Sequence, residues 1–127
     1  MNRRVLARAL AACAVATLLV ACGEDRKGEV RTSQLTAGAE ATYEYTVPFG
    51  TGNRLDGGEV IELMPAELNV KVGESIRIQN LDTRDYMIGP FFVTAGQVLA
   101  MKFTHPGELS GVCVVGSGGT FVINVTE

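Results

Sequence analysis

The side chains of this 127-residue sequence best suited to metal or thiol chemistry are three cysteines, Cys13, Cys22 and Cys113, and the only histidine, His105. Thiolates and imidazoles bind transition metals, and a thiolate is also a nucleophile. The sequence contains no catalytic Ser-His-Asp set and no glycine motif of the kind that cradles phosphate. Any such chemistry must be built from four side chains, and we expect the protein not to be an enzyme.

The N-terminus has the order of features found in an export signal. Arg3, Arg4 and Arg8 form a positive region, and residues 9–21 are then apolar apart from Thr17. This stretch is too short for a transmembrane helix, which needs about 20 apolar residues. Its length suits the apolar region of a cleaved signal peptide. The alternative is a short buried helix that happens to end in cysteine.

The tetrapeptide Leu19-Val20-Ala21-Cys22 that closes this stretch resembles the lipobox of bacterial lipoproteins. The resemblance implies that residues 1–21 are removed as a signal peptide and that the thiol of Cys22 carries a diacylglycerol. Two or three acyl chains anchor a protein firmly to a membrane. We therefore expect attachment to a bacterial cell membrane, facing the periplasm or the cell exterior.

Cleavage before Cys22 and lipidation of its thiol would change the number of free thiols and the net charge of the protein. Cys13 would be removed and Cys22 would be blocked, which leaves Cys113 without a partner for an internal disulfide. The removed residues hold three of the eleven basic residues and none of the fourteen acidic ones, so the mature net charge is −6. An acidic chain without a basic cluster argues against nucleic acid as a partner.

After Cys22 the composition divides the chain in two. Residues 22–41 are polar and rich in Gly and Ala, and we expect a lipid-anchored flexible linker there. Residues 42–127 show period-two alternation and frequent turn signals, and no segment has a helical period. Residues 48–58, rich in Gly and Pro, are expected to form a loop. The expected strands are 42–47, 59–64, 67–72, 74–80, 86–93, 98–104, 108–115 and 120–126.

Short strands of this number and spacing predict an all-β fold, either an antiparallel β-sandwich or a barrel. Several stretches then resemble, in order, the strands and turns of cupredoxins. They are Pro65-Ala66-Glu67-Leu68-Asn69-Val70-Lys71-Val72-Gly73-Glu74, Ile78-Gln79-Asn80-Leu81-Asp82, Gly89-Pro90-Phe91, Ala95-Gly96-Gln97, Phe103-Thr104-His105-Pro106-Gly107 leading to Cys113, and residues 119–125. The resemblance implies a Greek-key antiparallel β-sandwich over residues 42–127.

The same resemblance exposes missing copper ligands. A type 1 copper site takes two imidazoles, one thiolate and a weak axial ligand. The resemblance places the thiolate at Cys113, but it places the histidines at Tyr86 and near Gly116, and no methionine follows Cys113. We therefore expect no bound cofactor and a non-catalytic binding or accessory role, with a protein as the partner. The alternative is a copper carrier or electron-transfer protein with an atypical site at Cys113, completed by Met87, Tyr86 or His105.

Each candidate side chain also has a purely structural interpretation. Cys113 lies among valines and would be a small buried residue, and His105 would be an exposed turn residue. Tyr86 would pack at one end of the sandwich and find a partner for its hydroxyl. Met101, on the inward face of its strand, would belong to the core.

Two carboxylates, Asp82 and Asp85, flank Arg84 in a loop. Paired carboxylates can perform acid–base chemistry. We expect these two to be solvated instead.

Overall fold

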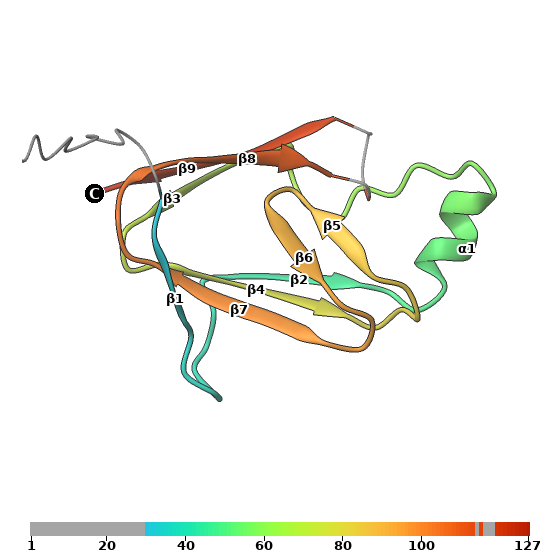
Figure 1. Cartoon of the computed structure of the whole chain (residues 1–127), viewed down its shortest axis with the longest axis horizontal. Helices are drawn as coiled ribbons and strands as arrows, with labels where there is room; N and C mark the ends of the chain where they lie inside the picture. Colours follow the sequence, from blue (N-terminus) through green and yellow to red (C-terminus); the bar gives the residue numbers. More distant parts are fainter. Residues whose placement is uncertain (1–29, 114, 116–118) are drawn as a thin grey trace, which may run out of the picture.

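The computed structural model describes residues 30–113, 115 and 119–127 (Figure 1). The expected signal peptide, Cys13, Cys22 and Gly116 lie outside the described residues. Within them, no helix is long and apolar enough to cross a membrane. The described chain forms β-strands, as the alternation predicted, and one short helix, which it did not predict.

The first sheet has four strands in the order β1-β7-β4-β2. Their bounds are Thr32–Gln34 for β1, Tyr43–Val47 for β2, Ser75–Asn80 for β4 and Val98–Phe103 for β7. Strand β7 runs antiparallel to β1 and to β4, whereas β2 runs parallel to β4. One face of this sheet buries Ile76, Ile78 and Phe103.

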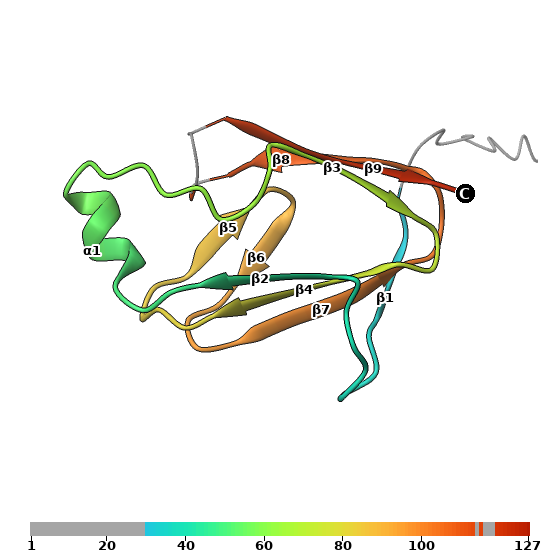
Figure 2. The same cartoon turned by 180° about the vertical axis from the view of Figure 1, so that it is seen from behind.

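The second sheet has three strands in the order β3-β9-β8. Their bounds are Glu67–Lys71 for β3, Gly107–Val112 for β8 and Thr120–Thr126 for β9. Strands β3 and β9 are parallel, and β8 and β9 are antiparallel. Alternation on β9 directs Phe121, Ile123 and Val125 into the core. The two sheets face each other across this core (Figure 2).

The β-sandwich is confirmed, but its sheets are mixed rather than purely antiparallel. The reason lies in the connections. After β2 the chain crosses to β3 in the other sheet before it returns as β4, so β2 and β4 enter the first sheet in the same direction. No hairpin links them, and a parallel pair results.

Residues 86–93 form a two-stranded hairpin, β5 (Tyr86–Ile88) and β6 (Phe91–Val93), where one bent strand was expected. The turn is Gly89-Pro90, with φ of 58° at Gly89. A Cβ on Gly111 would lie 2.3 Å from the carbonyl carbon of Gly89. Strand β8 can therefore approach the hairpin backbone only because residue 111 has no side chain.

The expected linker is part of the fold from residue 30 onward. Val30 is buried in the core, and β1 pairs with the outer edge of β7. Thr104 and Leu35 continue this pairing through backbone hydrogen bonds at either end of β1. All three residues of β1 are polar and exposed, so their sequence carries no alternation. Backbone hydrogen bonds, rather than side-chain burial, hold them on the sheet edge.

The helix α1 (Thr51–Asp56) occupies the middle of the expected loop 48–58, and residues 59–64 form no strand. The helix lies beyond the strand ends, at the end of the sandwich opposite the start of β1 (Figure 1). Six residues are too few for a helix to be stable by itself. Its position is set by contacts with the loop that follows β4.

Candidate functional site

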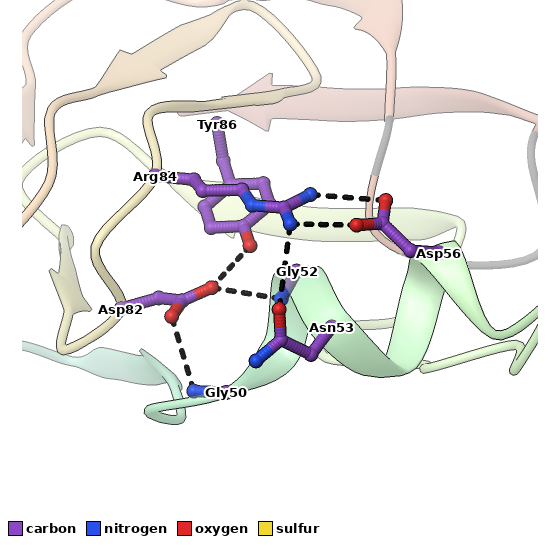
Figure 3. A network of polar contacts seen from close by, with 7 residues as sticks. All are labelled: Gly50, Gly52, Asn53, Asp56, Asp82, Arg84 and Tyr86. Atoms are coloured by element: carbon purple, nitrogen blue, oxygen red, sulfur yellow. Dashed lines mark hydrogen bonds and ion pairs between the residues drawn. The ribbon is translucent and has the colours of Figure 1, made fainter.

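The carboxylate of Asp82, in the loop between β4 and β5, accepts three hydrogen bonds from other residues. Asp82 and Tyr86 are both buried, and the hydroxyl of Tyr86 donates a hydrogen bond to Oδ2 of Asp82 (Figure 3). Tyr86 therefore packs at the end of the sandwich with its hydroxyl satisfied, as its structural interpretation predicted. The expectation that Asp82 is solvated was wrong, because protein donors rather than water surround its carboxylate.

The same carboxylate holds the first turn of α1. The amide of Gly50 donates to Oδ1 at 3.0 Å, and the amide of Gly52 donates to Oδ2 at 2.8 Å. The first amides of a helix have no partner within it. Gly50, at the N-cap, has no side chain that could serve, and the distant Asp82 takes this role.

Arg84 clamps the other end of the helix. Its guanidinium donates two hydrogen bonds to the carboxylate of Asp56, at 3.0 and 2.6 Å, and a longer one of 3.4 Å to Asn53. To reach Asp56 and Asn53, the side chain of Arg84 passes over Gly52. A Cβ on Gly52 would lie 2.5 Å from Cδ of Arg84. The loop after β4 thus binds α1 at both ends, through Asp82 at the first turn and Arg84 at the last (Figure 3).

These contacts set the protonation states of Asp82 and Tyr86. The hydrogen bond from Tyr86 is the main cause that holds the pKa of Asp82 well below its usual range, helped by the amides of Gly52 and Gly50 and opposed by burial. Burial is the main cause that raises the pKa of Tyr86 to about 12, and the hydrogen bond to Asp82 adds to it. The pair is a carboxylate and a neutral phenol over the physiological range.

Cys113 lies elsewhere, just beyond the end of β8. It is buried, and its thiol donates a hydrogen bond of 2.6 Å to the carbonyl oxygen of Val115. It borders a pocket of about 110 Å³ together with Glu62 and Met64. A methionine and a glutamate thus line the same pocket as Cys113. The sequence offered Met64, with Met87 and Met101, as a possible soft ligand, but it placed neither Met64 nor Glu62 near Cys113, because residues 59–64 were expected to form a strand.

His105 is far from Cys113. It is exposed in the turn before β8, where its ring nitrogen Nδ1 lies 3.0 Å from Oγ1 of Thr104. The six residues of β8 separate it from Cys113, a length of about 20 Å for an extended strand. Metal bonds to imidazole and thiolate are about 2.0–2.3 Å long. These two residues cannot share one metal ion in this fold.

The remaining candidates are dispersed. Met87 is exposed on β5, on the face opposite that of Tyr86 and Ile88, and Met101 packs against the core. Asp85 accepts a hydrogen bond of 2.8 Å from the amide of Ala95. No three His, Cys, Asp or Glu residues form a metal-binding group within the described part of the chain.

No family model and no curated protein matches this chain. Among solved structures it is similar to cupredoxins. Amicyanin from Paracoccus versutus is 13% identical over 76% of this chain and 99% of its own, with a TM-score of 0.47. The Cu-containing nitrite reductase NirK from Thermus scotoductus SA-01 is 21% identical over 75% of this chain and 25% of its own, with a TM-score of 0.40. The similarity concerns the β-sandwich alone, and it assigns neither a metal nor a function to this chain.

Proposed function

We propose that this protein is a lipid-anchored, extracytoplasmic bacterial lipoprotein with a cupredoxin-like domain that has no type 1 copper site. It serves as a non-catalytic binding or accessory module for a protein partner. The observation that carries the proposal is the state of Tyr86. At the position where the family resemblance expects a copper-binding histidine, this residue is buried and hydrogen-bonded to Asp82.

The chemistry of this pair supports the proposal. A phenol whose pKa is raised to about 12 is neutral at physiological pH and is a poor ligand for copper. Its proton is held by Asp82, which also fixes the first turn of α1 through two backbone amides. The polar groups at this end of the sandwich are thus used to hold the fold together. Binding of a metal by Tyr86 would break that network.

A binding role fits the surface beside the network. Phe49 and Leu81, at the adjoining ends of β2 and β4, leave 76% and 48% of their surface exposed. The backbone amide of Leu81 donates to the carbonyl of Val47, which keeps the two segments together. Contiguous exposed apolar patches mark contact sites for other proteins, and these two side chains are our candidates for such a site.

The lipid anchor is tested by mass spectrometry of the mature N-terminal peptide, produced in a bacterial host. We expect a peptide that begins at Cys22 and carries two or three acyl chains, and we expect Cys22→Ser to release the protein from membranes. An unmodified Cys22 at the mature N-terminus would refute the anchor. A pull-down from native membranes, with metal analysis of the eluate, then identifies the partner.

A second candidate function is a copper carrier, and one observation favours it. Cys113 and Met64 border the same pocket, and thiolate and thioether are ligands that select Cu(I). Met64 replaces Met87, Tyr86 and His105 as the most plausible companion of Cys113. Competition for Cu(I) against a chelator tests this. Tight binding that is lost in both Cys113→Ser and Met64→Leu would favour the carrier, and no competition would exclude it.

A further inference from the structure

One end of the sandwich is tied together by backbone hydrogen bonds around the start of β1. Thr104 donates to the carbonyl of Arg31, Gly73 donates to that of Phe103, and Val72 donates to that of Thr126. The connections β3–β4 and β7–β8 therefore lie beside the first residues of β1. We call this the β1 end, defined by residues 30–31, 71–74 and 102–106. Helix α1 lies at the opposite end (Figures 1 and 2).

The attachment of β1 shortens the distance over which a lipid on Cys22 could hold the domain. Val30 is buried in the core, and seven residues, 23–29, lie between Cys22 and Val30 in the sequence. Eight residue steps span about 29 Å at full extension. The expected linker of residues 22–41 would have allowed a much longer reach.

The length of the sandwich makes this limit matter. Strand β4 alone covers about 20 Å between the β1 end and the loop that grips α1. Helix α1 lies across this end rather than along the sandwich (Figure 1), so it adds about its width, about 10 Å. If the α1 end touched the bilayer, the β1 end would lie about 30 Å from the bilayer surface, which is about the full extended length of residues 22–30. A segment of seven residues reaches that far only at full extension.

We infer that the protein is held on the bilayer with the β1 end toward the phospholipid headgroups, and that the α1 end is kept away from the membrane. The inference rests on the lipid anchor proposed above. It does not depend on charge, because exposed basic residues at this end, among them Arg31 and Lys71, are accompanied by the carboxylates of Glu74 and Glu127. The surface around Phe49 and Leu81 then faces partners in the extracytoplasmic space.

A matched pair of exposed valines tests the orientation. Val72 lies at the β1 end with 38% of its surface exposed, and Val60 follows α1 with 67% exposed. Each is replaced by cysteine in the full-length lipoprotein that carries Cys113→Ala, labelled with one donor fluorophore and placed in vesicles of phosphatidylethanolamine and phosphatidylglycerol. Headgroup-labelled acceptor lipids report the height of each site by energy transfer. A third protein carries twenty Gly and Ser residues inserted between Glu29 and Val30.

We expect energy transfer from Val72→Cys to be at least twice that from Val60→Cys, and the insertion to bring the two values together. Equal transfer from both sites in the protein without the insertion would overturn the orientation. So would a difference that persists unchanged with the insertion, since the linker would then not be its cause. Failure of the protein to float with vesicles is a separate result, which would refute the lipid anchor itself. Unchanged circular dichroism of the labelled proteins controls for folding.

Discussion

The hydroxyl of Tyr86 donates a hydrogen bond to the carboxylate of Asp82, and both side chains are buried. This contact joins the first residue of β5 to the loop after β4. Through its other hydrogen bonds the same carboxylate joins that loop to α1. One buried charge therefore links the start of β5 and the loop before it to α1, which lies about thirty residues away in the sequence. Buried charges are tolerated only when hydrogen bonds replace their lost water, and here three protein donors do so.

The first prediction concerns Tyr86→Phe, which removes one donor to Asp82 and keeps the ring. We expect a loss of about 2 kcal/mol in the free energy of unfolding, because hydrogen bonds to charged groups contribute about 1.5–3 kcal/mol. Urea unfolding measures it. Tyr45→Phe is the matched control. The ring of Tyr45 packs against the same core, and burial is the only cause that raises the pKa of its hydroxyl. We therefore expect little change in the free energy of unfolding of Tyr45→Phe. Equal losses in the two variants would contradict the role of the Tyr86 hydroxyl.

We expect acid to remove the contribution of the Asp82 carboxylate to the free energy of unfolding. Its pKa is lower in the folded protein than in the unfolded chain, so its stabilisation is complete above the unfolded value of about 4. It is lost as the pH falls through the lower folded value. We expect Asp82→Asn to destabilise the protein at pH 7 and the difference from the wild type to shrink below about pH 4. Unfolding curves across this range test the sign, and a difference that grows in acid would contradict it.

We expect alkali to ionise Tyr86 and to remove its contribution to the free energy of unfolding. Its pKa is raised to about 12 in the folded protein, so its contribution is complete below the unfolded value of about 10 and is lost as the pH rises toward 12. Ultraviolet titration of tyrosinate follows this ionisation, and Tyr86→Phe identifies which step belongs to Tyr86. A step near pH 10 that disappears in this variant would show that the phenol is solvated.

Gly111→Ala is expected to be one of the more damaging single-methyl additions in the fold. Its Cβ would lie 2.3 and 2.4 Å from the carbonyl carbon and oxygen of Gly89, and this backbone has no rotamer with which to move aside. We expect a loss of about 2–3 kcal/mol. Gly119→Ala is the control, because no atom lies within 4 Å of its Cβ position. Similar thermal midpoints for the two variants would contradict the close approach of β8 to the hairpin.

The sequence was informative where side chains alternate. Period-two alternation places Leu68 and Val70 on β3, and Ile76 and Ile78 on β4, in the core, and all four are buried there. The same alternation places Val72 inward, which is wrong, because 38% of its surface is exposed. The hydrogen-bonding of the Tyr86 hydroxyl was also predictable, because a buried phenol requires a partner. The sandwich class followed from these patterns.

Other elements leave no such pattern. Strand β1 is polar on both faces, and its only apolar signal is the preceding Val30. Helix α1 has a glycine N-cap, and its first turn is completed by Asp82, about thirty residues away in the sequence. No local propensity reports a cap of this kind. For the same reason Asp82 resembled an ordinary loop carboxylate until the structure placed two glycine amides beside it.

The absence of a type 1 copper site is the central claim, and the visible spectrum after loading with copper tests it most directly. The lipoprotein in detergent receives one equivalent of Cu(II), and loosely bound metal is removed by gel filtration. We predict no intense thiolate-to-copper band, because Tyr86 is engaged with Asp82 and His105 lies a strand length from Cys113. A stoichiometric blue or red chromophore that disappears in Cys113→Ser would contradict the account.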